Sequence, residues 1–222
     1  IKLPKVKALI FMKAHSERVP KKNMRIFNGK PLFHSIITSL SNSPYISEII
    51  INTDSEEIAK NAKDNFRVTI HMRPKYLLKI DSNEANQIIE YDLTKTDGDF
   101  FIQSHSTNPL LKTDTINRSI ETFFSVTNTS LFSVTEHYKR FYNIDNLPIN
   151  HEPFSLIKTQ EMMPLYEENS SIYIFSRESF RKNRNRLDIN PYLFKINKTE
   201  AIDIDDPDDF NIANCLMSFN KK

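Results

Sequence analysis

Short apolar runs alternate with helix-like segments along most of this chain, and this alternation constrains its fold more than any other feature. Strand-like runs are found at residues 6–12, 48–52, 99–103, 130–135 and 171–175. Apolar residues recur at helical spacing in segments that begin near Pro31, Glu56, Asn83 and Thr113, and a last helix is expected to begin at Pro207. Alternating strands and helices are typical of βαβ units. We therefore predict a three-layer α/β protein with a mostly parallel sheet.

Length and composition favour one ordinary globular domain. The 222 residues are 39% hydrophobic, which is enough for a sizeable core, so residues 1–222 are assigned to a single domain. No run approaches the roughly 20 apolar residues of a membrane span, and the first residues lack the apolar run of a signal peptide. We therefore expect no membrane association and a cytoplasmic location. A net charge of +2 does not call for a nucleic-acid partner, and the single Cys215 is predicted to be a buried apolar filler.

A basic loop follows the first apolar run. Residues 13–23 read KAHSERVPKKN and place several cations in one turn. Because open α/β sheets bind ligands at the carboxyl ends of their strands, this loop is expected to hold a polyanion such as a nucleoside triphosphate. Only two glycines occur in the chain, so side chains rather than a glycine-rich loop must hold the phosphates. Arg18 offers a bidentate fork and Lys22 a point charge. A solvated basic loop without a ligand is the alternative.

Two aspartates stand near the other end of the chain, in the segment AIDID at residues 201–205. If this segment is extended, Asp203 and Asp205 share one face at about 7 Å along the strand. Such a pair suits Mg²⁺, which takes one or two protein carboxylates and completes its shell with waters and phosphate oxygens. An extended capping cluster is the alternative for this pair. Three further aspartates around Pro207 are assigned to helix capping, namely Asp206, Asp208 and Asp209.

The basic loop and the acidic segment complement each other chemically. Phosphoryl and nucleotidyl transfer rely on alignment and charge neutralisation, with little covalent help from the protein. Cations that hold a triphosphate and acids that hold magnesium would supply both. The two segments together therefore predict nucleotidyl transfer with Mg²⁺ as cofactor.

Residues 136–170 lack a clear period and are predicted to form an irregular insertion. Prolines and polar residues interrupt this segment. It nevertheless retains many apolar side chains, namely Phe141, Tyr142, Phe154, Leu156, Ile157, Met162, Met163 and Tyr166. A free linker is less apolar than this, so we expect the segment to serve assembly.

Several ordered segments resemble the CMP-sugar synthetases, and the acylneuraminate cytidylyltransferase branch in particular. The matching segments are residues 13–23, 28–32, 52–55, 103–112, 169–174 and 202–205. Members of that family join CTP and a free 2-keto sugar acid, giving a CMP-sugar and pyrophosphate. The resemblance implies a Rossmann-like nucleotide-binding topology of the nucleotide-diphospho-sugar transferase type. It also implies that the insertion is a small dimerisation arm and that the protein is a homodimer.

The resemblance also assigns roles to individual residues. Contacts to the nucleotide are expected from Lys13, Ser16, Arg18, Lys22, Asn23 and Asp81. Contacts to the acidic sugar are expected from Gln103, Lys112 and Asn169. The magnesium ligands would be Asp203 and Asp205. The catalytic residues would be Arg18, Lys22 and Asp205.

Two departures from the family pattern bear on the substrate. Lys13 stands where the family usually has an arginine, which keeps the charge and loses the guanidinium fork. Glu167 or Glu168 matches an arginine that several sialate-specific members carry, and a carboxylate there would repel a sugar acid. Lys112, Arg140 or an arm residue of a second subunit could replace that charge.

Two rival functions stay open at this point. One is a nucleotidyltransferase of the same fold that uses another nucleotide or a sugar phosphate, which a test of CTP preference would separate. The other is a catalytically silent relative that binds a nucleotide or a partner through the arm.

Overall fold

A seven-stranded sheet forms the centre of the protein, with the strand order β5-β4-β1-β6-β8-β7-β9. The computed structural model describes residues 3–16, 18–78, 84–155 and 157–219. The strands in this order are β5 (Thr69–Met72), β4 (Ile46–Thr53), β1 (Val6–Met12), β6 (Phe100–His105), β8 (Leu165–Ser176), β7 (Ser130–His137) and β9 (Tyr192–Lys195). Only β8 runs antiparallel to its neighbours in the sheet. The predicted mostly parallel sheet is confirmed.

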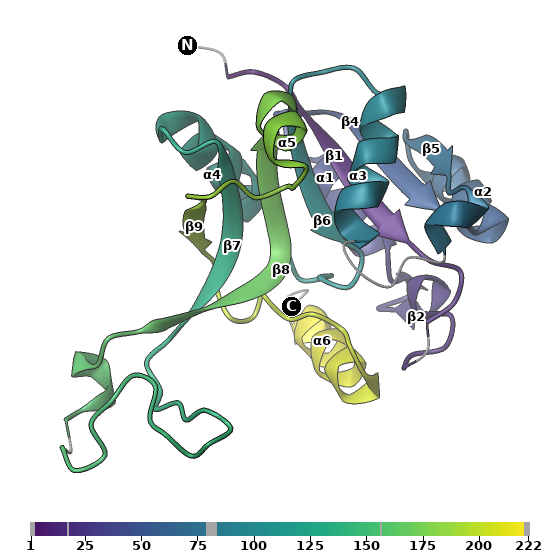
Figure 1. The fold of residues 1–222 in the computed structure, drawn as a ribbon. Helices are drawn as coiled ribbons and strands as arrows, with labels where there is room; N and C mark the ends of the chain where they lie inside the picture. The colour runs from purple at the N-terminus through teal and green to yellow at the C-terminus, as the bar shows by residue number, and fades with distance from the viewer. Residues whose placement is uncertain (1–2, 17, 79–83, 156, 220–222) are drawn as a thin grey trace.

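Helices cover both faces of this sheet, as Figure 1 shows. These are α1 (His34–Ser41), α2 (Glu56–Asn65), α3 (Glu84–Lys95), α4 (Thr113–Ser125) and α5 (Arg177–Asn183), while α6 (Pro207–Phe219) packs on the loops beyond the strand ends. Short 3₁₀ turns lie at η1 (Lys22–Met24), η2 (Lys75–Leu78) and η3 (Thr159–Glu161). Side chains of β1 alternate between two cores: Ala8 and Ile10 pack with α1, α2 and α4, while Leu9 packs with α3 and α5. The three-layer arrangement is therefore confirmed.

Pro31 belongs to a small hairpin and not to a helix. Strands β2 (Ile26–Phe27) and β3 (Lys30–Pro31) pair through the two-residue loop Asn28-Gly29, where both residues have positive φ. An Asn-Gly pair is the strongest short-range signal for such a turn. The prediction that the first helix begins at Pro31 is thus wrong, and α1 begins at His34.

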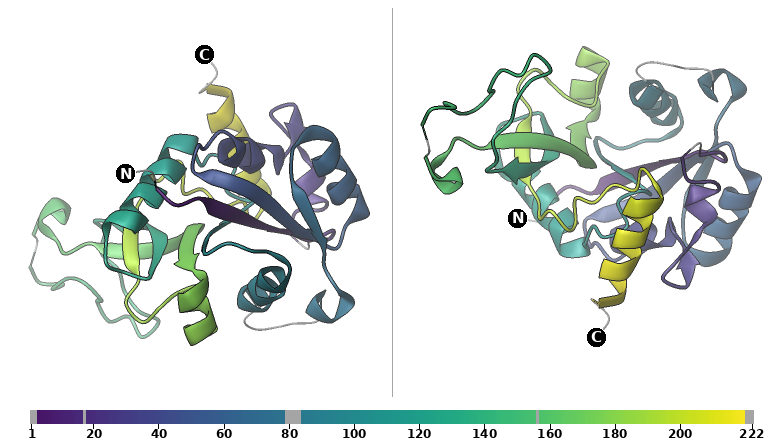
Figure 2. Two further views of the ribbon diagram at one scale, coloured as in Figure 1. Left: turned by 90° about the horizontal axis from the view of Figure 1, so that it is seen from above. Right: turned by 90° about the horizontal axis from the view of Figure 1, so that it is seen from below.

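The insertion is more regular than its sequence indicates. Strand pairing between β7 and β8 continues to His137 and Leu165, so the segment without regular strands or long helices is residues 138–164 rather than 136–170. The two strands leave the sheet as a ribbon and carry the insertion away from the body, as Figure 2 shows in both views. The sequence shows no period of two here because three consecutive residues of β8, namely Tyr166, Glu167 and Glu168, are all exposed.

Two further expectations are tested by the described part of the chain. Cys215 lies on an exposed face of α6, so the prediction that it fills the core is wrong. Among the described helices, none is both long and apolar enough to cross a lipid bilayer.

The topology determines where a site can form. Strands β4, β1 and β6 are parallel neighbours, so the loops that follow Thr53, Met12 and His105 meet at one edge of the sheet. This edge is where open α/β sheets bind ligands.

Candidate functional site

Neighbouring loops hold the basic loop after β1 from both sides. On one side, the backbone N–H of Ala14 donates to Asp54 Oδ1 at 2.7 Å. On the other, the buried Asn23 donates from Nδ2 to the Lys13 carbonyl at 3.1 Å, and its Oδ1 accepts the Ser106 hydroxyl at 2.6 Å. Asn23 therefore fixes the loop against the end of β6.

The basic loop contacts the acidic segment directly. Arg18 Nη2 lies 2.6 Å from Asp205 Oδ1, and Lys22 Nζ donates to the Ile204 carbonyl at 2.5 Å. Burial lowers the pKa of Lys22. The Arg18 and Asp205 side chains are 65% and 51% exposed, and such surface pairs contribute only about 0–1 kcal/mol to stability. Arg18 can therefore exchange this partner for a phosphate at small cost.

The acidic segment at residues 201–205 belongs to no strand. It is attached instead to the loop after β6, because the Ile204 N–H donates to the Thr107 carbonyl at 2.9 Å. The buried Ile204 side chain packs with Phe27 and Phe210. Five alternating residues form a strand only if another strand lies beside them for hydrogen bonding, and the local pattern does not show this. Asp203 and Asp205 nevertheless line the same pocket.

Helix capping at α6 is carried by other aspartates. Asp206 Oδ1 accepts the backbone N–H groups of Asp208 and Asp209 at 2.8 and 2.9 Å. Asp209 Oδ2 accepts those of Asp205 and Asp206 at 3.0 and 3.1 Å. The prediction of structural roles is confirmed for Asp206 and Asp209, and neither the Asp203 nor the Asp205 carboxylate accepts an N–H bond from α6 among the hydrogen bonds of the described residues.

Asp203 is the residue of this segment whose surroundings best fit a cation ligand. Its Oδ1 is buried and has no hydrogen-bond partner among the described residues, and burial raises its pKa. An unpartnered carboxylate oxygen in such a place is costly unless a ligand completes it. Asp203 and Asp205 line a pocket of about 550 Å³ that also includes Glu168 and Asn169, here called the aspartate pocket.

This donor set fits magnesium. Both residues offer hard carboxylate oxygens, and Mg²⁺ uses one or two of these while keeping waters and substrate phosphates as its other ligands. Within the described ranges, no three or more His, Cys, Asp and Glu residues gather as a complete metal cage. The pair suits a cation that is shared with a phosphate ligand.

A second pocket lies over the basic loop and has a volume of about 500 Å³, here called the loop pocket. Five of the six expected nucleotide contacts line it, namely Lys13, Ser16, Arg18, Lys22 and Asn23. Lys13 is held by an ion pair to Glu84 of α3 at 2.9 Å. The sixth, Asp81, lies outside the described residues.

Gln103 in β6 and Asn169 in β8 are both buried. Gln103 Oε1 accepts a hydrogen bond from Arg186 Nη1, and its Nε2 lies 2.9 Å from His105 Nε2. Asn169 accepts the Ser133 hydroxyl at 2.6 Å and donates to the Thr135 hydroxyl at 3.1 Å. Asn169 thus holds β7 and β8 together at the wall of the aspartate pocket.

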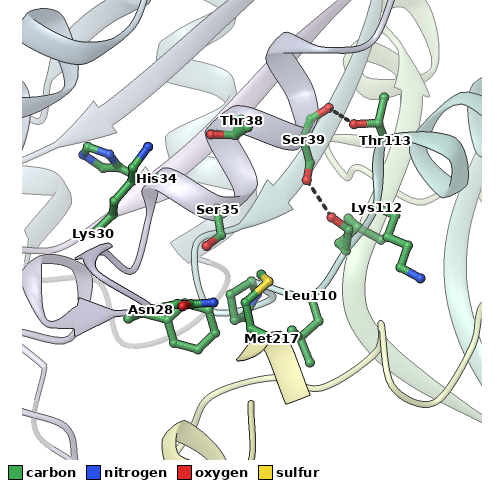
Figure 3. A pocket seen from close by; sticks show the side chains of 13 residues that line it. Asn28, Lys30, His34, Ser35, Thr38, Ser39, Leu110, Lys112, Thr113 and Met217 are labelled. Atoms are coloured by element: carbon green, nitrogen blue, oxygen red, sulfur yellow. Dashed lines mark hydrogen bonds between the residues drawn. The ribbon is translucent and has the colours of Figure 1, made fainter. Parts of the chain in front are cut away.

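Lys112 lies elsewhere. It lines a pocket of about 430 Å³ between α1, the hairpin and α6, together with Asn28, Ser35 and Met217. Figure 3 shows its side chain extending away from Ser35 and Asn28. Its backbone N–H donates to Glu200 at 3.0 Å. The structure therefore does not bring Lys112 to the pocket lined by Asn169.

Arg186 is the site residue that the sequence did not reveal. It follows α5, and its guanidinium carbon lies 3.4 Å from the centre of the Tyr173 ring. Its contact to Gln103 joins residues 83 positions apart. No motif surrounds it, so only the folded chain shows that it belongs to this edge of the sheet.

The fold and this site define a nucleotidyltransferase, in which cations suited to phosphate face carboxylates suited to a metal. The model of the cytidylyltransferase family matches residues 7–216, so the chain belongs to that family.

Individual relatives and structures agree with this assignment. The chain is 28% identical over 229 residues to CMP-N,N'-diacetyllegionaminic acid synthase of Legionella pneumophila, with 98% of each chain covered. It is 24% identical over 220 residues to N-acylneuraminate cytidylyltransferase of Streptococcus agalactiae, with 91% of this chain and 51% of that protein covered. The solved structure of CMP:2-keto-3-deoxy-manno-octonic acid synthetase complexed with CTP has the same fold, with a TM-score of 0.75 and 13% identity over 97% of this chain and 99% of that one.

Proposed function

We propose that this protein joins CTP to a 2-keto sugar acid and releases pyrophosphate. The observation that carries this proposal is the contact of the basic loop with the acidic segment, at Arg18 with Asp205 and at Lys22 with the Ile204 carbonyl. The family supports the use of CTP. The names of the two relatives support the acceptor, because one specifies diacetyllegionaminic acid and the other N-acylneuraminate.

The loop pocket supplies the groups that would hold the triphosphate. Arg18 and Lys22 would neutralise the two phosphates that leave, while Lys13 and Ser16 line the rest of the pocket. An acceptor hydroxyl oxygen forms a bond to the α-phosphorus as the bond to the β-phosphate oxygen breaks, and the hydroxyl proton goes to solvent. Because Asn23 fixes the loop, these cations are positioned before the ligand arrives.

Asp203 and Asp205 would hold magnesium in the aspartate pocket. Two carboxylates beside a triphosphate repel it unless a cation lies between them. When bound, Mg²⁺ supplies charge neutralisation at the phosphates. Asp203 would contribute its unpartnered Oδ1, and Asp205 would leave its contact with Arg18.

We further propose a cytoplasmic homodimer formed through the insertion at residues 138–164. Ile144, Phe154 and Met163 are 97%, 96% and 80% exposed, which is unusual for side chains of this size. A second copy of the chain would cover them. Sedimentation equilibrium should then give twice the chain mass of 26.0 kDa, and Phe154→Glu should shift the mass toward that of the monomer. A wild-type monomer at all concentrations would contradict this.

The activity is tested by pyrophosphate release. Each of the four nucleoside triphosphates is supplied with magnesium and a panel of 2-keto sugar acids and sugar phosphates. Release is expected with CTP and one or more acids only. Release with another nucleotide or with a sugar phosphate would favour the rival enzyme of the same fold. Binding of a nucleotide without any release would favour a catalytically silent relative.

A further inference from the structure

The aspartate pocket lacks an evident partner for the carboxylate of an acid acceptor. Its described lining is rich in acids, including Glu167, Glu168 and Asp209, and Lys198 is its only lysine or arginine. The two cations expected from the sequence lie elsewhere: Lys112 lines a separate pocket, and Arg140 Nη2 donates to the Ile157 carbonyl within the insertion at 2.7 Å. Neither of these two cations therefore faces an acid acceptor in the aspartate pocket.

We propose that Arg186 binds the carboxylate of the acceptor. This inference rests on the proposed function and names a residue that gives the site its preference for acids. Contacts connect Arg186 to residues of both pockets: on one side, Gln103 joins it to His105 of the loop pocket. On its other side it faces Tyr173, whose hydroxyl donates to Glu168 of the aspartate pocket.

The guanidinium is held firmly in this position. Nη1 donates to Gln103 Oε1, the guanidinium carbon lies 3.4 Å from the centre of the Tyr173 ring, and the Arg186 backbone N–H donates to Asn86 Oδ1 at 3.0 Å. Arginine stacked on an aromatic ring loses little freedom when it binds a second ligand. Arg186 is thus oriented before the acceptor binds.

Part of the fork is left free for a ligand. Nε and Nη2 of Arg186 make no hydrogen bond to any residue within the described ranges. Neither atom is among the fully buried side-chain atoms without a partner, so neither is completely shielded from solvent. Nε and one Nη of a guanidinium form the planar pair of donors that matches the two oxygens of a carboxylate.

Burial strengthens the attraction between this pair of donors and a carboxylate. Burial lowers the pKa of Arg186, but an arginine remains charged at neutral pH. A carboxylate at this place would meet a cation that is only partly hydrated. The nearby Glu168 carboxylate offsets the charge of Arg186, so it competes with an acid acceptor. Glu168→Gln should therefore lower the acceptor KM.

The experiment compares the steady-state kinetics of wild type and four variants with CTP and the best acid acceptor. Arg186→Gln removes the charge, and Arg186→Lys keeps the charge without the fork. Arg184→Gln is the matched control, because Arg184 lies two residues away and forms an exposed ion pair with Glu90. Lys198→Gln tests the other cation of the aspartate pocket. Each protein is also assayed with the amide of the same acceptor, which carries no negative charge.

Arg186→Gln is expected to raise the acceptor KM about 30-fold or more, with the CTP KM within twofold of wild type, because a charged hydrogen-bonded pair is broken. Arg186→Lys should recover part of the loss, and Arg184→Gln should match wild type. With the amide, wild type and Arg186→Gln should perform alike. If Arg186 only positioned Gln103, the acid and the amide would be affected equally, and the proposal would be wrong.

Three other outcomes of the experiment would overturn the role of Arg186. A loss in Lys198→Gln with none in Arg186→Gln would assign the carboxylate to Lys198. An active wild type with unchanged Arg186→Gln kinetics would keep the proposed function and reject only this inference. A wild type that binds CTP and turns over no acid would reject the proposed function, and the role of Arg186 with it. Melting temperatures of all variants show whether any change reflects unfolding.

Discussion

The Arg18 guanidinium lies 2.6 Å from an Asp205 carboxylate oxygen, although 187 residues separate the two in the chain. This contact brings the basic loop after β1 against the acidic segment before α6. Lys22 reinforces it through the Ile204 carbonyl. A cation-rich pocket and a carboxylate pair thereby become neighbouring parts of one site.

Removal of either carboxylate should abolish most of the activity. Asp203→Ala and Asp205→Ala are each expected to reduce kcat about 100-fold or more, because the charge of the transferred phosphates would then be poorly neutralised. Pyrophosphate release at saturating CTP measures this. Asp208→Ala is the matched control, because it lies in the first turn of α6. Near-normal turnover in both Asp203→Ala and Asp205→Ala would reject their role.

Substitution of Lys22 should raise the CTP KM far more than substitution of the adjacent Lys21. Lys22 is half-buried in the loop pocket, whereas Lys21 is exposed and does not line it. Lys22→Gln should raise the CTP KM about tenfold or more, since it removes a partly buried phosphate partner. Lys21→Gln should change it less than about threefold, as expected for an exposed charge. Equal effects of the two variants would indicate a diffuse charge effect instead of a defined contact.

Because of His105, the free energy of unfolding should decrease at acidic pH. Burial, and secondarily the charge of Arg186, lowers the pKa of His105 from 6.5 to about 4. In the unfolded chain this histidine binds a proton as the pH falls below 6.5, whereas in the folded chain it does so only near pH 4. The free energy of unfolding therefore decreases between these two pH values. Between pH 7 and 4.5, wild type should lose roughly 2–3 kcal/mol more than His105→Gln. Urea unfolding at both pH values measures the difference, and parallel losses would contradict it.

Ser170 stores strain that glycine would release. Its φ is 59°, in the left-handed region that costs a non-glycine residue roughly 1–2 kcal/mol. Because glycine also gains freedom in the unfolded chain, Ser170→Gly should stabilise the protein by about 0.5–1 kcal/mol. Ser171→Gly is the control: Ser171 has no positive φ and is buried in β8, so the change should be destabilising. A lower melting temperature for Ser170→Gly would contradict this account.

The sequence predicted those parts of the site that local patterns encode. Lys13, Arg18 and Lys22 follow an apolar strand, which places them at the ligand-binding edge of a parallel sheet. The capping role of Asp206 followed from its place before Pro207. Such features depend on spacing along the chain and can be read without a structure.

Features that depend on distant contacts could not be predicted. Arg186 acquires its role only because β6 and β8 bring Gln103 and Tyr173 beside it. Likewise, residues 201–205 have a strand pattern but belong to no strand, and contacts to Lys22 and Thr107 hold Ile204 in place. Strands β5 and β9, of four residues each, are too short for a period of two to be distinguished from chance.

The most direct test of the central claim follows the phosphorus of CTP by ³¹P NMR. CTP, magnesium and an acid acceptor from the panel are incubated with wild type and with Asp203→Ala. The account predicts equal amounts of pyrophosphate and of a new CMP phosphodiester with wild type, and neither with the variant. Unchanged CTP signals with wild type and every acid, or the same products from Asp203→Ala at the same rate, would contradict the claim that these two segments form a cytidylyltransferase site.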